Sequence, residues 1–379
     1  MDFELSADQK LLLETAASFV KRESPVTRLR KLRDDAIGWQ KPAWKAMAEL
    51  GWLAIAFPEE AGGLGGSFVD AAIVLEQLGT TLVPEPFIPT LVAATTLARG
   101  GDAAQRDRWL APALAGDTSL ALAWGEEGGR YHPCHITTRA EKKGDGWVLR
   151  GAKTFVDNGH AADALVVSAR TSGSDDDREG VSLFVVAPDA PGVTRRAFAT
   201  IDGHRAAHVA LDGATVAAGA LLGEAGAGAS VLDEALDVGA AAACAESVGV
   251  MRAVLAMTCD YLRTREQFGV KIGSFQALQH RAVDMFVETE LSRSVSMMAS
   301  IKVSSPDATE RAAAISAAKA QVAESGRFVT QQAIQLHGGI GVTDEHDVGL
   351  YFKRMHALIT AFGDQEHHVA RFAALPTFA

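Results

Sequence analysis

The 379-residue sequence predicts an α+β protein whose secondary structure runs in the order α, β, α. Apolar residues recur at helical spacing in residues 1–118. Short β-type runs separated by glycine, aspartate and asparagine turns fill residues 119–222, and long alanine-rich helical stretches make up residues 223–379. We therefore expect an N-terminal α-helical domain, a middle β domain and a C-terminal helical-bundle domain with these bounds.

The N-terminal segment opens with a signal for the start of a helix. Ser6 and Gln9 have the spacing of a capping box, in which each side chain satisfies a free backbone amide of the first helical turn. The glycine-rich stretch 58–66 predicts a loop. We expect further helices at about residues 41–50, 68–78 and 90–98.

The middle segment alternates between β-branched or apolar runs and turn residues, which is typical of a small β-barrel or sandwich. The acidic stretch 173–180 predicts a solvated loop rather than a metal site. The expected strands cover residues 120–124, 136–140, 147–149, 164–169, 181–186 and 207–211.

The C-terminal segment predicts long helices. The small residues at 238–245 would let neighbouring helices approach closely, as in the core of a bundle. The expected helices cover about residues 230–265, 275–303 and 308–336.

Composition and charge exclude several classes of protein. Hydrophobic residues make up 48% of the chain, which excludes a disordered protein, and a net charge of −11 argues against a broad nucleic-acid-binding face. We see no apolar run of the roughly 18–20 residues that a membrane span needs, and no secretory signal at the start. Three widely separated cysteines suggest neither a disulfide framework nor a zinc clasp. We therefore expect a cytoplasmic protein without a metal.

Common catalytic and nucleotide-binding motifs are missing from the sequence. It contains no P-loop, no Gly-x-Gly-x-x-Gly after a strand, no nucleophile elbow and no His-Glu-x-x-His. The acidic and histidine residues at 344–347 and 366–368 are adjacent in sequence, so on a helix they would point in different directions and would not hold a metal together.

Two segments of the last domain carry chemical information. In the first, residues 263–269, the guanidinium of Arg265 can donate two hydrogen bonds to one phosphate. In the second, residues 335–341, Gly338 and Gly339 leave backbone amides open to an anion. An arginine at a helix end or a Gly-Gly helix stop is ordinary by itself. Their joint occurrence, about 70 residues apart and behind a β domain, is what makes them informative.

At these segments the chain resembles the acyl-CoA dehydrogenase family, and the match runs nearly end to end. The matching segments are GWLAIAFPEEAGGLG at 51–65, GWVLRGAKTFVDNG at 146–159, Arg-x-Gln-Phe-Gly at 265–269 and Gln-x-x-Gly-Gly-x-Gly at 335–341. The resemblance implies an N-terminal α-helical domain, a middle β-barrel and a C-terminal four-helix bundle. It also implies bound FAD, an acyl-CoA substrate, and assembly as a dimer or tetramer.

The resemblance also assigns cofactor-binding residues. It places the ADP half of FAD across a subunit interface, with one group of residues on one side and the other group supplied by the other chain's bundle. Phe155 falls in the segment that lies against the flavin ring. The first group is Arg265, Gln267, Phe268 and Gln276, and the second is Gln335, Gly338 and Gly339.

The chain departs from the family pattern where the catalytic base is expected. Most members carry a glutamate near the C-terminus that removes the substrate α-proton, and Phe362 occupies that position here. A minority place the glutamate on the first bundle helix, where this chain has Gly239, with Asp237 as the one acid nearby. Asp157, in the flavin-facing segment, would oppose negative charge on a reduced flavin.

Three interpretations follow from these departures. In the first, the chain is one subunit of a heterotetramer whose homologous partner carries the flavin ring site and the base. The 363–368 ending resembles small subunits of bacterial dehydrogenases for steroid side chains or dicarboxylic acyl-CoAs. In the second, it is a self-sufficient homo-oligomer that uses Asp364 as the base, although Asp364 also suits the N-cap of a helix at 365–372. In the third, the fold serves as a flavin oxidase, a monooxygenase or a non-catalytic scaffold.

Overall fold

The computed structural model describes residues 4–376 and confirms the α+β class, with helical N- and C-terminal parts and a central sheet. The chain forms two compact units, each built from separate stretches of sequence. The boundary between them falls inside one long helix, at Gly239 and Ala240. The three domain ranges predicted from the sequence, 1–118, 119–222 and 223–379, remain a prediction. The helical unit combines the described parts of Met1–Lys31, Phe68–Val83 and Ala240–Ala379, and the β unit combines Leu32–Ser67 and Pro84–Gly239.

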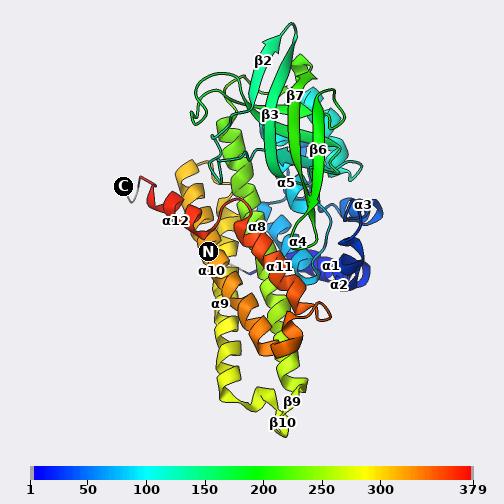
Figure 1. Ribbon diagram of the computed structural model, residues 1–379, viewed down its shortest axis with the longest axis vertical. Helices are drawn as coiled ribbons and strands as arrows, with labels where there is room; N and C mark the ends of the chain where they lie inside the picture. Colours follow the sequence, from blue (N-terminus) through cyan, green and yellow to red (C-terminus); the bar gives the residue numbers. More distant parts are fainter. Residues whose placement is uncertain (1–3, 377–379) are drawn as a thin grey trace. The chain divides into compact units, whose positions relative to one another are not determined.

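The helical unit is a bundle whose long helices are joined by short connections (Figure 1). A two-stranded hairpin, β9 (Glu266–Gln267) and β10 (Val270–Lys271), links α8 to α9. The long helices predicted for this region are confirmed to within one or two residues at each end. The helices are α1 (Ala7–Glu23), α2 (Val26–Leu32), α4 (Phe68–Thr81), α8 (Ala229–Thr264), α9 (Gln276–Lys302), α10 (Ala308–His337), α11 (Val348–Thr360) and α12 (Gln365–Ala373).

Side-chain caps fix where several of these helices begin. The predicted capping box of α1 is confirmed, because Ser6 Oγ accepts from the Gln9 amide at 3.1 Å while Gln9 Oε1 accepts from the Ser6 amide. Asp307 caps α10 by accepting from the amides of Thr309 and Glu310. These bonds satisfy amides that have no partner within the helix.

Helices α4 and α8 approach each other unusually closely inside the helical unit. A Cβ built at Gly249 of α8 would lie 1.9 Å from the Glu76 carbonyl oxygen, and one at Gly79 would lie 2.3 Å from that of Glu246. Only glycine leaves room for backbones at this distance. The closest approach of α8 to α4 is therefore at Gly249, outside the stretch 238–245 predicted from the sequence.

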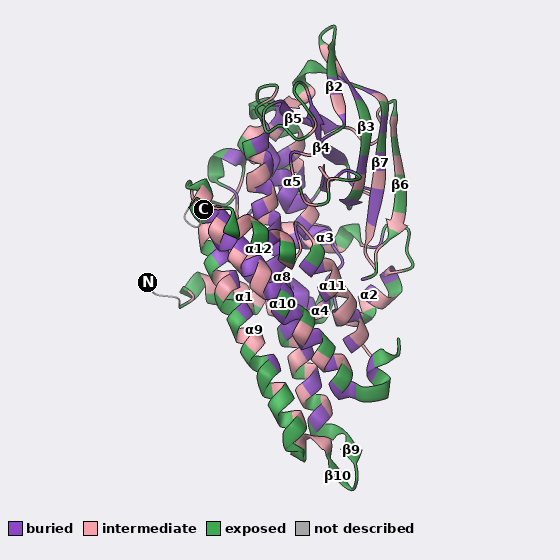
Figure 2. Cartoon of the chain, turned by 60° about the vertical axis from the view of Figure 1, so that its left-hand side comes forward, coloured by how far each residue is buried: buried purple, intermediate pink, exposed green. Residues whose placement is uncertain are grey.

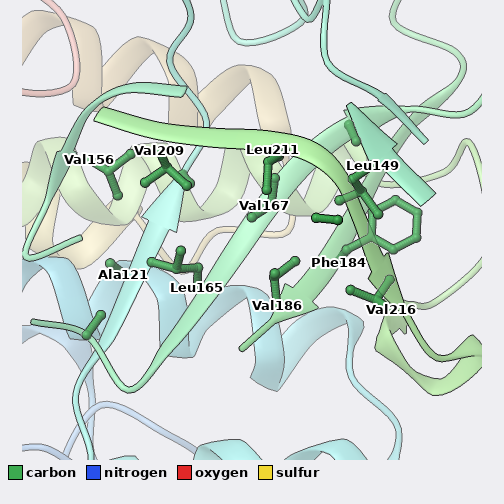
Figure 3. Packing of buried hydrophobic residues seen from close by; sticks show 14 of the residues in the cluster. Ala121, Leu149, Val156, Leu165, Val167, Phe184, Val186, Val209, Leu211 and Val216 are labelled. Carbon is green, nitrogen blue, oxygen red and sulfur yellow. The ribbon is translucent and has the colours of Figure 1, made fainter. Parts of the chain in front are cut away.

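The β unit contains an eight-stranded, mostly antiparallel sheet in the order β6-β7-β3-β2-β4-β5-β8, with β1 paired in parallel to β4. Its buried side chains form one apolar core (Figure 3). The partly buried Trp147 packs edge-on against Phe184 of this core. The strands are β1 (Leu120–Ala123), β2 (Arg139–Lys143), β3 (Gly146–Asp157), β4 (Ala164–Arg170), β5 (Val181–Val186), β6 (Val193–Ala199), β7 (Arg205–Val216) and β8 (Leu221–Leu222).

Two strand predictions need correction. The strand predicted at 136–140 begins at Arg139, because the preceding residues belong to a loop anchored by side chains. Strand β6 was not predicted at all: it is an edge strand, and the half-buried Arg195 and exposed Arg196 break the apolar alternation expected of a strand. β3 and β7 are also longer than predicted, at twelve residues each.

Helical segments of the β unit flank the sheet in the sequence. Trp44 of α3 donates from Nε1 to the Thr118 carbonyl at 3.1 Å, and Thr90 Oγ1 of α5 accepts from the Leu120 amide at 3.3 Å. Both α3 and α5 are therefore hydrogen-bonded to the start of β1. These segments are α3 (Lys41–Glu49), η1 (Glu59–Ala61), α5 (Phe87–Gly100), α6 (Ala103–Gln105), the π-helical turn η2 (Arg106–Leu110), α7 (Ala111–Leu114) and η3 (Ala218–Ala220).

Helix α8 is long and apolar enough to cross a membrane by length and composition, contrary to the expectation from sequence, and within residues 4–376 no other helix meets both criteria. However, 78% of its apolar window is buried (Figure 2). This burial is typical of the core helix of a bundle.

We predict that Gly249→Ala lowers the free energy of unfolding by about 1–3 kcal/mol, because the new methyl group overlaps the Glu76 carbonyl. Urea unfolding followed by circular dichroism measures this change. Gly219→Ala is the control: nothing lies within 4 Å of its Cβ position, and we expect a change below about 1 kcal/mol. Equal stability of the two variants would contradict the close packing of α4 on α8.

Candidate functional site

Phe155 is an exposed aromatic residue on strand β3. The register between β3 and β7 shifts between Lys153 and Val156, and Phe155 sits in that irregularity with φ +53°. Its side chain is 63% exposed and its ring lies edge-on to Phe198, with centroids 5.2 Å apart. A bulky residue with positive φ is strained, and such strain is concentrated at functional positions. Phe155 therefore presents a largely exposed aromatic ring to solvent.

A buried ion pair lies beneath this part of the sheet. Lys153 Nζ donates to Glu126 Oε1 at 2.6 Å and to Ser168 Oγ at 2.9 Å, and both charged side chains are almost completely buried. Burial by itself raises the pKa of Glu126, but the Lys153 charge and hydrogen bonds outweigh it and lower that pKa to about 2. Burial lowers the pKa of Lys153 to about 8, against the opposing effect of Glu126. Both groups are therefore charged at neutral pH.

Glu126 also closes the loop that precedes β2. Its carboxylate accepts from the amide of Thr137 at 2.7 Å and from the amide of Thr138 at 3.2 Å. Because Lys153 lies two residues before Phe155 on β3, one ion pair anchors both the loop and the strand that carries the exposed ring. The sequence did not reveal this pair, since its members lie 27 residues apart and the family-like segment that contains Lys153 does not indicate its partner.

In the helical unit, the Arg265 segment forms the hairpin between α8 and α9. The two turn residues Phe268 and Gly269 both have positive φ, as a type I′ turn requires. Phe268 is 90% exposed, and Arg265, Gln267 and Gln276 are exposed as well. The hairpin therefore presents a guanidinium, amide groups and an aromatic ring to solvent.

The glycine segment lies at the end of α10. Gly338 ends this helix with φ +63°, and a Cβ built at Gly338 or Gly339 would have nothing within 4 Å. Gln335, one turn earlier, is exposed. The backbone here is accessible from outside, which suits a phosphate that approaches backbone amides.

A ring stack connects these two segments within one chain. Tyr261 near the end of α8 stacks on His337 at the end of α10, with ring centroids 4.6 Å apart. The Arg265 amide donates to the Tyr261 carbonyl at 2.9 Å, while Gly338 directly follows His337. The two predicted cofactor segments therefore lie at the same end of one bundle. The open glycine backbone and exposed Arg265 at this end suit the pyrophosphate of a flavin dinucleotide.

His337 itself is a site residue that the sequence analysis missed. Its Nδ1 donates to the Ala333 carbonyl at 2.7 Å, and its buried Nε2 has no hydrogen-bond partner in the described part of the chain. Burial lowers the pKa of His337, and the nearby His346 lowers it further. It therefore stacks as a neutral ring.

The position of the expected base lies in the turn between α11 and α12. Phe362 has φ +57° and Gly363 has φ +116°. Asp364 is the N-cap of α12, with Oδ1 accepting from the His367 amide at 2.9 Å. The predicted capping role of Asp364 is confirmed, whereas its catalytic role stays a prediction. Asp237, the acid near the alternative base position, is buried.

The acyl-CoA dehydrogenase domain families match almost the whole chain: the N-terminal domain over residues 6–117, the middle domain over residues 121–214 and the C-terminal domain over residues 226–374. The chain belongs to the acyl-CoA dehydrogenase family. The family and fold that the sequence motifs predicted are therefore confirmed, and oxidoreductase chemistry on acyl-CoA is the activity that goes with this family.

Similar proteins agree with this assignment. Acyl-CoA dehydrogenase IpdE2 of Mycolicibacterium smegmatis is 30% identical over 98% of this chain and 99% of its own length. A chain of the ChsE4-ChsE5 complex from Mycobacterium tuberculosis is 29% identical with a TM-score of 0.89, and the match covers 98% of both chains. Butyryl-CoA dehydrogenase from Megasphaera elsdenii is 25% identical with a TM-score of 0.89, covering 98% of this acyl-CoA dehydrogenase and 99% of that chain.

We predict that Glu126→Gln lowers the free energy of unfolding by about 3–5 kcal/mol, because it leaves the Lys153 charge buried without its partner. The double variant Glu126→Gln/Lys153→Met removes both charges and should recover part of that loss. Thermal and urea unfolding of the three proteins measures the coupling. Additive losses in the double variant would show that the pair is not a coupled unit.

Proposed function

We propose that this acyl-CoA dehydrogenase uses FAD to introduce an α,β double bond into an acyl-CoA thioester as one subunit of a hetero-oligomer with a homologous partner. In this reaction the α-hydrogen leaves as a proton to a carboxylate, the β-hydrogen leaves as a hydride, and the carbon–carbon double bond forms. FAD supplies the hydride acceptor when it is bound. The substrate class we favour is a fatty acyl or steroid side-chain thioester.

The residues that would hold the ADP half of FAD are retained. Arg265 would form charge-assisted bonds to the pyrophosphate, and the amides at Gly338 and Gly339, which the resemblance assigns to the other chain's bundle, would approach it where no side chain intervenes. Gln335, Gln267 and Gln276 add amide donors and acceptors on the same exposed end of the bundle. In the self-sufficient alternative, where this chain also carries the ring site, Phe155 would lie against the flavin ring, on the strand that the Lys153–Glu126 pair anchors.

The observation that carries the hetero-oligomer proposal is the missing base. Phe362, a group that cannot accept a proton, stands where most family members have a glutamate. The nearest acid, Asp364, is engaged as the cap of α12. A chain with an intact ADP site and no base is explained if a partner subunit supplies the carboxylate.

An exposed apolar face on α9 supports assembly with another chain. Val283, Phe286, Val287 and Leu291 recur at helical spacing and are each about half exposed. Met298 and Ile301 continue the same face toward the end of the helix. A contiguous apolar helix face of this kind marks a protein interface. The ChsE4-ChsE5 relative is itself a complex of two named chains.

The second candidate is a self-sufficient homo-oligomer in which Asp364 removes the α-proton. Its support is the position of Asp364, two residues after Phe362 and only half-buried. This alternative requires one carboxylate both to cap α12 and to accept the proton.

We predict that Arg265→Ala weakens FAD binding to the assembled enzyme about 10- to 100-fold, because the pyrophosphate loses a charge-assisted partner. Equilibrium dialysis or flavin fluorescence measures the affinity. Arg263→Ala is the matched control on the same helix end, where the arginine pairs with Asp260 at 3.0 Å. Unchanged FAD affinity in Arg265→Ala would remove the main support for the cofactor site.

We predict that Asp364→Asn leaves the rate of flavin bleaching by acyl-CoA near that of the wild type, because asparagine keeps the helix cap and a partner carries the base. Stopped-flow absorbance of the flavin measures this rate. A loss of about a hundredfold or more in a purified single-chain enzyme would instead make Asp364 the base.

A further inference from the structure

A lysine is completely buried behind the turn that carries Phe362. Lys319, on α10, donates from Nζ to the carbonyls of Ile359 at 3.0 Å and Gly363 at 2.9 Å. These carbonyls lie at the end of α11 and in the turn that follows it. Burial lowers the pKa of Lys319 to about 8, opposed by electrostatic interactions with Cys244 and Asp364. A charged amine is therefore kept in the bundle interior chiefly by main-chain oxygens.

A buried histidine holds the remaining carbonyl of the turn. His368 Nε2 donates to the Phe362 carbonyl at 3.1 Å, and its Nδ1 lies 3.4 Å from Ser316 Oγ. Burial and then the Lys319 charge lower the pKa of His368 to about 2, so the ring stays neutral. Lys319 and Ser316 both belong to α10, so this helix contacts the turn directly through Lys319 and indirectly through Ser316 and His368.

The conformation of the turn needs this support. Phe362 and Gly363 have positive φ in succession, and a Cβ built at Gly363 would lie 2.6 Å from ring atoms of both His367 and His368. A positive φ at a phenylalanine is strained, and it persists only where the surrounding structure enforces it. Each of the three carbonyls at 359, 362 and 363 has a side-chain donor.

We propose that Lys319 and His368, here called the turn clasp, are positioning residues that fix the direction of side chain 362. An apolar residue at 319 would fill the same interior without the cost of burying a charge, so stability alone does not account for the lysine. The clasp acts only on backbone carbonyls, and its effect is therefore independent of which side chain stands at 362. This inference rests on the proposed function, because it assigns residue 362 to the acyl site.

The proposal has a consequence for the missing base. If the clasp still holds position 362 as a base position, Phe362→Glu places a carboxylate where it can take the α-proton, while the hydride passes to FAD and the double bond forms. In an FAD-loaded assembly whose partner base has been removed by a Glu→Gln substitution, we expect Phe362→Glu to raise acyl-CoA-dependent flavin bleaching at least tenfold. Adding Lys319→Met should remove most of this gain through kcat, with KM and flavin content changed less than about twofold.

Hydrogen exchange tests the clasp without cofactor or substrate. Lys319→Met should raise amide exchange across residues 361–366 at least tenfold in the full chain, while exchange in α9 is unchanged. Lys302→Met is the matched control, since this lysine is part-exposed and pairs with Glu310 on the surface of the same bundle. If Lys319→Met does not fold, His368→Leu removes the Phe362 carbonyl contact and makes the same prediction.

The outcomes separate this inference from the proposed function. Unchanged exchange at 361–366 in the folded clasp variants would overturn the clasp. Equal kcat for Phe362→Glu with and without Lys319→Met would also overturn it, because the lysine would then be structural only. An inactive Phe362→Glu variant whose turn loosens as expected on Lys319→Met would instead support the clasp and count against the acyl-site assignment.

Discussion

The stack of Tyr261 on His337 is the contact on which the cofactor end of the helical unit depends. It joins the last turns of α8 and α10, and the two segments with cofactor chemistry directly follow those turns. The hairpin with Arg265 continues from one ring, and the open Gly338–Gly339 backbone continues from the other. Because His337 is buried and neutral, the contact is a packing interaction that adds no charge next to the basic hairpin.

The bundle also supports the turn at Phe362, where the expected catalytic base is missing. At the Phe362 turn, α10 supplies Lys319 and Ser316, so the helix that ends in the cofactor segment also braces the expected base position. The brace is intact although the base is absent. A chain with this geometry but without the carboxylate fits a subunit that binds the cofactor while a partner subunit removes the α-proton.

Much of the architecture was predictable because it follows local periodicity. The long helices of the bundle and the capping box of α1 follow directly from residue spacing. Strand β6 was missed because an exposed edge strand with arginines at 195 and 196 does not have to alternate. Helix α11 (Val348–Thr360) was also not predicted.

The candidate site was predictable only where it is made of motifs. Arg265, Gly338 and Phe155 could be given roles from family-like segments, whereas no role could be assigned from the sequence to Lys153, Lys319 or His368. Their roles depend on partners far away in the sequence, and a buried charge cannot be distinguished from a surface charge before the chain is folded. Asp364 could be read as a cap or as a base, and only the bond to the His367 amide revealed the cap.

The most direct test of this account is the ratio of FAD to polypeptide, measured with the mass in solution, for this chain purified alone and purified with a homologous partner that carries the base. The account predicts much less than one FAD per chain for the protein alone, and a mixed assembly with bound FAD that acyl-CoA bleaches once the partner is present. One FAD per chain in a homo-oligomer that acyl-CoA bleaches would contradict it, and would identify the protein as an enzyme with its own base.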